Sequence, residues 1–262
     1  MRVVLVTVDE PFYIPAFIRT LIEGRGKDIV GIVVSSKRVP FRNSLRQLAR
    51  NGLHFYGFRG FIIQGLLYLR CRILNSLRFI LPFRASYSVR AVAEHYSLPF
   101  RSCQNINEPH FLEFLSGELD PDVIVSISSD QIFKKDILNL PRLGCINVHS
   151  SLLPKYRGLL PAFWVLARGE SETGVTVYYM DEKLDNGDII LQAKVAIRPE
   201  DTVHSLITRT KKLGADLVLQ ALDRIETGIV SITPNDSKEA TYYSFPTAQD
   251  AKMLKQRGRK FR

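Results

Sequence analysis

The chain has 262 residues, 45% of them hydrophobic and 24% charged, which is typical of a globular protein with a sizeable core. Its three cysteines, Cys71, Cys103 and Cys145, lack metal-like spacing and a secretory context, so we expect a reducing, cytoplasmic setting. No apolar run approaches the roughly 20 residues that a membrane-spanning helix needs, and the N-terminal apolar run stops at Asp9 without a signal-peptide pattern.

The net charge of +10 is concentrated in two segments. Residues 37–100 hold eleven basic residues against one acidic residue, Glu94, and the chain after Ala251 holds six basic residues and no acidic one. The rest of the chain is therefore net negative. This distribution predicts an acidic body with two basic patches that favour an anionic partner.

A β-α-β unit is predicted at the start of the chain. Short β-branched runs at residues 3–8 and 29–34 flank a helical pattern at residues 16–23, and such a unit favours a parallel sheet. The buried-strand pattern returns four more times, at residues 122–126, 144–148, 175–180 and 189–195. The sequence therefore predicts an α/β fold with an open, mostly parallel, Rossmann-like sheet.

Residues 40–85 are rich in aliphatic, aromatic and arginine side chains and predict an inserted helical segment. One interpretation is a helical hairpin that packs on the domain or on a second subunit as a homodimer contact. Another is a surface for an anionic or lipid-linked acceptor, including peripheral membrane contact through residues 55–83. Nucleic-acid binding is less favoured, because no recognition helix or RNA-binding signature accompanies the charge.

A long amphipathic helix is predicted over residues 204–225, with Asp201 and Thr202 as candidate caps at its start. A shorter helix containing Trp164 is expected after Pro161.

Three polar residues form the candidate site. Asn147 and His149 alternate on a predicted strand, so their side chains face the same side near the end where ligands bind in open α/β sheets. Asp185 lies in an acidic turn after a later strand and can return to the same edge. Each residue alone has a structural interpretation: a strand-end histidine that is satisfied in the fold, or an aspartate that bonds its own turn. The acidic turn lacks the distal glutamate of a calcium loop, and we expect no metal site.

In combination these motifs resemble the folate-dependent formyltransferase family, which includes glycinamide ribonucleotide, methionyl-tRNA and nucleotide-sugar N-formyltransferases. The resemblance rests on INVHSSLLPKYRG followed by ETGVTVYYMDEKLDNGDIILQ, which contain an N-x-H strand, an S-L-L-P turn and an L-D-x-G loop. It implies the formyltransferase fold, with a catalytic domain over residues 1–232, the insertion at about 40–85 and a basic extension over residues 233–262.

The resemblance also implies roles for particular residues. Asn147, His149 and Asp185 are expected to be catalytic, with 10-formyltetrahydrofolate as the co-substrate. The cofactor contacts are expected at these residues: Gln131, Ile132, Phe133, Met180 and Asp181. Here SSDQIF replaces the aromatic-glycine or aromatic-methionine pattern of many relatives. Formyl transfer passes through a tetrahedral intermediate, whose oxyanion an amide and an imidazole can stabilise.

The acceptor is expected to be a primary amine on a nucleotide- or lipid-linked amino sugar, whose phosphates match the basic patches. Two alternatives remain: an enzyme like methionyl-tRNA formyltransferase without its C-terminal barrel, so that tRNA stays a candidate partner, and a catalytically silent binding module.

Overall fold

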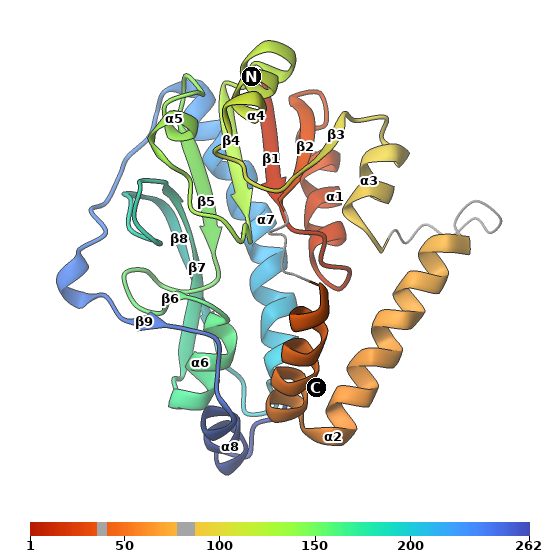
Figure 1. Cartoon of the computed structure of the whole chain (residues 1–262). Coiled ribbons are helices and arrows are strands. Elements are labelled where there is room, and N and C mark those ends of the chain that lie inside the picture. The colour runs from red at the N-terminus through yellow and green to blue at the C-terminus, as the bar shows by residue number, and fades with distance from the viewer. Residues whose placement is uncertain (36–40, 78–86) are drawn as a thin grey trace.

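The computed structural model describes residues 1–35, 41–77 and 87–262, apart from the side chains of residues 41–51 and 54 (Figure 1). Parts of the predicted insertion at residues 40–85, and of the proposed membrane-contacting stretch at 55–83, therefore lie outside the described residues.

A seven-stranded sheet with the order β3-β2-β1-β4-β5-β7-β8 forms the centre of the molecule (Figure 1). The strands from β3 to β5 pair in parallel, whereas β7 and β8 run antiparallel at one edge. Their bounds are β1 Val3–Thr7, β2 Ile29–Ser35, β3 Phe100–Cys103, β4 Val123–Ile127, β5 Cys145–His149, β7 Glu172–Tyr179 and β8 Ile189–Ala196. The predicted open, mostly parallel sheet is confirmed.

Helices cover both faces of this sheet because successive strand residues point to opposite sides. In β1, Val3 and Leu5 pack with α1 and α7, whereas Val4 and Val6 pack with α4 and α5. The helices are α1 Ile14–Arg25, α3 Val89–His95, α4 Pro109–Phe114, α5 Lys135–Leu138, α6 Pro161–Arg168 and α7 Val203–Thr227, with a π-helical turn, Leu115–Leu119, after α4. The result is a three-layer α/β/α arrangement.

The long helix α7 begins where the sequence predicts. Thr202 caps it by accepting a hydrogen bond from the Ser205 backbone N–H, while the Ser205 hydroxyl accepts from the Thr202 N–H. Asp201 forms a 2.7 Å ion pair with Arg209. The helix ends at Gly228, whose φ of 70° lies in the left-handed region that glycine tolerates best.

The insertion contains the helix α2, Phe41–Ser76, which is broken at Gly57 where the backbone turns to φ 70° and ψ 169°. Figure 1 shows its two halves diverging from this break. Just before the break, Phe55 is buried among the rings of Phe163, Phe245 and Phe261. The first half is thereby anchored to the body. Within the residues that the structure describes, no helix combines the length and apolarity needed to cross a membrane.

The chain after α7 packs on the body through elements that the sequence analysis missed. These are a short helix Ser237–Glu239, the strand β9 Tyr242–Tyr243 and the helix α8 Ala248–Gln256. β9 pairs in parallel with β6, Arg157–Gly158, and further on the carbonyl oxygens of Lys260 and Phe261 accept hydrogen bonds from the start of α7. The boundary at residues 232 and 233 stays a prediction.

Candidate active site

Asn147 and His149 lie near the carboxyl end of β5, two residues apart and therefore on the same side of the strand. Asn147 is half-buried and His149 is buried. Asp185 lies in the loop that joins β7 to β8, where its backbone has a left-handed φ of 48°. Its carboxylate is also buried, and one oxygen lies 3.7 Å from Nδ1 of His149. The structure thus brings the three predicted residues together.

Tyr178 connects two members of this trio, Asn147 and Asp185, and was missed by the sequence analysis. Its hydroxyl accepts a 2.9 Å hydrogen bond from Nδ2 of Asn147 and donates a 2.8 Å bond to Oδ1 of Asp185. The antiparallel register of β5 and β7 places Asn147 directly opposite Tyr178, so both side chains share one face of the sheet. That register is the signal that identifies Tyr178.

Burial raises the pKa of Tyr178 well above its ordinary value, and the negative charge of Asp185 raises it further. The phenol therefore stays neutral and keeps its proton for Asp185. Asn147 uses one amide hydrogen for Tyr178, and the second remains for another acceptor.

His149 is oriented by a backbone carbonyl. Its Nε2 lies 2.8 Å from the carbonyl oxygen of Tyr156, which can only accept, so Nε2 carries a hydrogen and Nδ1 is the nitrogen that gains or loses a proton. The Tyr156 backbone N–H donates to the hydroxyl of Thr241, and its ring stacks on Tyr243 at 5.2 Å between centroids. The C-terminal segment thus holds Tyr156 in place, and the carbonyl oxygen of Tyr156 sets the tautomer of His149.

Arg157 ties the two site loops to the same C-terminal segment. The residue is fully buried, and its guanidinium donates to Oδ1 of Asn186 at 2.9 Å, to the hydroxyl of Tyr242 at 2.8 Å and to Oδ1 of Asn235 at 2.9 Å. Asn235 in turn donates to the carbonyl oxygen of Asp185. We call Arg157, Asn186, Asn235 and Tyr242 the arginine brace.

Gly158 holds the second oxygen of the Asp185 carboxylate. Its backbone N–H donates a 2.7 Å hydrogen bond to Oδ2 of Asp185. Its φ is +96°, and a Cβ atom there would lie 2.2 Å from the carbonyl oxygen of Tyr243. Only glycine fits this close approach.

Of the predicted cofactor contacts, three lie in the loop after β4. The side chain of Gln131 bonds to the backbone of Gln104 and Ile106, so it shapes the loop. Ile132 is 58% exposed and presents an apolar surface, whereas Phe133 is fully buried in the core. Phe133 can therefore offer a ligand only its backbone.

The other two predicted cofactor contacts follow β7. Met180 is half-buried, and its backbone N–H donates to the carbonyl oxygen of Cys145. Asp181 accepts hydrogen bonds from the Lys183 N–H at 2.9 Å and from the Asn186 side chain at 2.6 Å. Through Asn186, this aspartate is linked to the arginine brace.

A half-buried lysine on α7, Lys211, was not singled out from the sequence. Lys211 donates a 2.6 Å hydrogen bond to the hydroxyl of Ser128, which directly follows β4. Burial lowers the pKa of Lys211 to about 8, and the charge of Glu10 opposes that shift.

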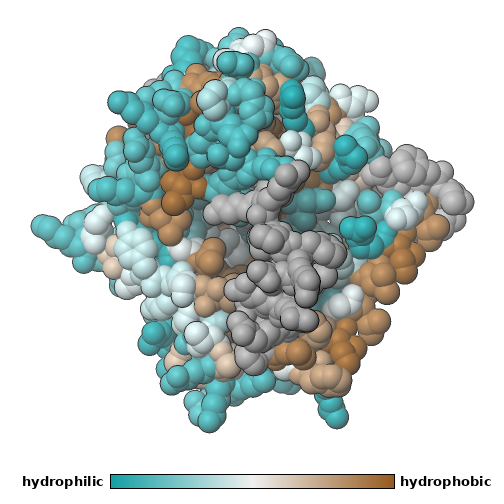
Figure 2. All heavy atoms as spheres, viewed as in Figure 1, coloured by the Kyte–Doolittle hydropathy of each residue, from teal (hydrophilic) through white to brown (hydrophobic). Residues whose placement is uncertain are grey.

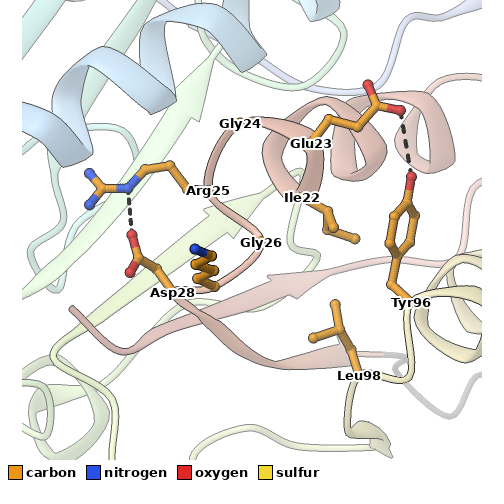
Figure 3. Close-up of a pocket in the computed structure, with 9 residues that line it drawn as sticks. Ile22, Glu23, Gly24, Arg25, Gly26, Asp28, Tyr96 and Leu98 are labelled. Carbon is orange, nitrogen blue, oxygen red and sulfur yellow. Dashed lines mark hydrogen bonds and ion pairs between the residues drawn. The ribbon is translucent and has the colours of Figure 1, made fainter.

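One surface pocket lies at the opposite end of the sheet. It is formed where α1 ends and β2 begins, and its lining includes Arg25, Asp28 and Tyr96 (Figure 3). The 2.6 Å ion pair between Arg25 and Asp28 closes one side of it. This pocket contains no part of the trio. Among the described residues, no group of three or more His, Cys, Asp or Glu side chains is arranged to hold a metal ion.

The formyl transferase family model matches residues 84–222, more than half of the chain, and the chain belongs to this family. It is 44% identical over 154 residues to a methionyl-tRNA formyltransferase of Syntrophus aciditrophicus, which covers 59% of this chain and 49% of that protein. The chain thus spans about half the length of the curated relatives it matches.

Solved structures support the fold. A phosphoribosylglycinamide formyltransferase from Anaplasma phagocytophilum has a TM-score of 0.60 at 18% identity, over 93% of this chain and 98% of that one. An N-formyltransferase from Helicobacter canadensis, solved with folinic acid and dTDP-3-aminofucose, has a TM-score of 0.58 at 16% identity, over 93% and 71%. These similarities confirm the expected formyltransferase fold.

Proposed function

We propose that this protein transfers a formyl group from 10-formyltetrahydrofolate directly to a primary amine, with Asn147, His149 and Asp185 as catalytic residues. The observation that carries the proposal is the clustering of these three side chains in a member of the formyl transferase family: Tyr178 hydrogen-bonds to Asn147 and to Asp185, and Nδ1 of His149 lies 3.7 Å from the Asp185 carboxylate. A family fold alone does not imply an activity, but a trio held at this geometry supports one.

Charge stabilisation is the first task of the site. When the amine attacks the formyl carbon, the carbonyl oxygen becomes an oxyanion. The second amide hydrogen of Asn147 and a protonated Nδ1 of His149 are the donors available for it. Removing one such donor typically lowers kcat by about 100- to 1,000-fold.

Proton transfer is the second task. The attacking amine loses a proton as its bond to the formyl carbon forms, and N10 of the folate must gain one as its bond to that carbon breaks. Asp185 and Nδ1 of His149 lie 3.7 Å apart and can pass this proton, while Tyr178 and Gly158 hold the carboxylate in place.

The donor assignment is supported by the Helicobacter canadensis neighbour, which was solved with folinic acid. We place the folate near the loop after β4 and the loop after β7, where Ile132 offers an exposed apolar surface and Asp181 a carboxylate. Gln131, Phe133 and Met180 then form the supporting wall of this subsite.

For the acceptor we favour a nucleotide- or lipid-linked amino sugar. Its phosphates match the basic residues of the insertion and the chain after Ala251, and the same neighbour was solved with a nucleotide-linked amino sugar. We place the reaction in the cytoplasm, in agreement with three cysteines that are free thiols.

A second candidate acceptor is methionyl-tRNA. The observation that favours it is the 44% identity, over 154 residues, to a methionyl-tRNA formyltransferase. Sugar N-formyltransferases of known structure that share the fold are 16–20% identical to this chain.

The test is to incubate the purified protein with 10-formyltetrahydrofolate and a panel of amino-sugar nucleotides and Met-tRNA, and to detect the mass gain of one formyl group. Asp185→Asn serves as the matched inactive control, because it keeps the shape of the side chain and removes its charge. A formylated amino sugar supports the first candidate and formylated Met-tRNA the second. If the protein binds 10-formyltetrahydrofolate but forms no product with any acceptor, a catalytically silent binding module is favoured instead.

A further inference from the structure

The second half of α2, after the break at Gly57, carries large apolar side chains that the protein leaves in solvent. Six of them are between 44% and 71% exposed: Phe58, Ile62, Ile63, Leu66, Leu69 and Ile73. Figure 2 shows a run of hydrophobic residues along the side of the molecule where Figure 1 places this helix. We call these six residues the apolar stripe. Exposed apolar patches of this kind mark interaction surfaces.

Helical geometry gathers five of the six residues on one face, and Ile63 lies beside that face. Phe58, Ile62, Leu66, Leu69 and Ile73 follow the spacing of four, four, three and four residues that places side chains on a common face. The anchoring contacts lie elsewhere, because Phe55 precedes the break at Gly57 and packs on the body. The stripe is thus held out from the body rather than used to fold it.

The charges beside the stripe have one sign. Arg59 and Arg70 lie along one edge of the helical face and Arg72 along the other, and all three are exposed. The whole helix Phe41–Ser76 contains no aspartate or glutamate. None of the three arginines forms an ion pair with a carboxylate among the described residues. An apolar face bordered by arginines complements a surface that is apolar inside and anionic outside.

We propose that the apolar stripe binds the surface of an anionic lipid bilayer, with α2 lying in the plane of the interface. The five side chains on the common face enter the boundary between headgroups and acyl chains, while the arginines contact lipid phosphates. A second copy of this chain would also cover apolar side chains, but it would bring the same arginines together without a carboxylate on α2 to pair them. The inference concerns binding only and does not depend on the formyl-transfer reaction.

The experiment is co-sedimentation of the full chain with vesicles of equal parts phosphatidylglycerol and phosphatidylcholine, compared with phosphatidylcholine alone. We expect binding to the anionic vesicles that weakens as salt is added, and much weaker binding to the neutral ones. The double variant Ile62→Ser/Leu66→Ser should bind roughly tenfold or more weakly. Ile229→Ser, at a 75% exposed residue outside α2, is the matched control and should bind like the wild type.

Circular dichroism and thermal unfolding check that each variant is folded. Equal sedimentation of the wild type and the double variant would overturn the proposal, as would no sedimentation of the wild type. Sedimentation velocity without lipid gives a second test: a dimer that Leu66→Ser dissociates shows that a second copy occupies the stripe, and the lipid proposal is then wrong.

Discussion

Arg157 and Arg72 place the same guanidinium in opposite settings. Arg157 is fully buried and donates to side chains from the loop before β8 and from the C-terminal segment, whereas Arg72 is exposed on α2 with no carboxylate on its own helix. A buried guanidinium needs nearly all its hydrogen bonds to offset the loss of water, so it fixes geometry. An exposed one keeps its water and remains available to an external anion. The basic charge of this protein therefore has two separate tasks.

The largest expected effect tests whether the braced region is the reactive one. In His149→Ala, we expect kcat for formyl transfer to fall by about 1,000-fold or more, because both a donor and a proton carrier are lost. The measurement is product formation with the accepted amine, together with thermal unfolding to show an intact fold. Normal turnover by the folded variant would remove His149 from the mechanism.

The arginine brace gives the next effect. Arg157→Met should lower the free energy of unfolding by about 3–5 kcal/mol, because buried acceptors on Asn186 and Asn235 lose a charged donor. Arg72→Met on the exposed helix is the matched control, with an expected change within about 0.5 kcal/mol. Urea unfolding of both variants gives the two values. An equal loss of unfolding free energy in both variants would show that the buried and the exposed arginine contribute alike to stability.

Tyr178→Phe should lower kcat less than His149→Ala does. The comparison distinguishes a residue that positions the trio from one that takes part in the reaction. The variant keeps the ring and deletes the hydroxyl that joins Asn147 to Asp185. A hydrogen bond to a charged group contributes about 1.5–3 kcal/mol, so we expect kcat to fall roughly 10- to 100-fold. Steady-state kinetics should show the loss in kcat more than in KM. An unchanged kcat would reduce Tyr178 to a packing residue.

The smallest effect concerns Lys211 on α7, a half-buried lysine whose pKa lies well below the ordinary value. Because the pKa of Lys211 is lowered from 10.5 to about 8 in the folded protein, the unfolded chain binds the proton more tightly. Stability contributed by this group therefore rises as pH increases from about 8 towards 10.5. Thermal unfolding across this range should show the rise in the wild type but not in Lys211→Met. If the melting temperatures of the wild type and of Lys211→Met change with pH in parallel, Lys211 does not contribute this pH dependence.

The sequence predicts well what depends on local pattern. The buried runs identify β1, β2, β4, β5, β7 and β8, and the capping residue Thr202 marks the start of α7. The motifs that contain Asn147, His149 and Asp185 are short and ordered along the chain, so the sequence predicts that these side chains meet at one edge of the sheet, as they do. β3 was missed because two of its four residues, Arg101 and Ser102, are exposed and its burial pattern is weak.

What the sequence did not predict depends on contacts between distant segments. Tyr178 is one of two adjacent tyrosines in β7, and only the register with Asn147 distinguishes its role. Arg157 looks like one more basic residue until Asn235 and Tyr242 are placed around it. Likewise, no local pattern separates the buried Phe133 from the exposed Ile132 beside it.

The arginine brace has a consequence for how the site comes into being during synthesis. Asn235 and Tyr242 lie 78 and 85 residues after Arg157 along the chain, so their hydrogen bonds close long loops. Loop closure of this length has an entropic cost that must be offset by the contacts it makes. A growing chain has made the whole trio by residue 185, yet the loop that carries Asp185 gains its support from Asn235, and the Tyr156 backbone that orients His149 gains its support from Thr241, only after these later residues have been added. The proposed formyl-transfer activity is therefore expected to appear later in synthesis than the sheet itself.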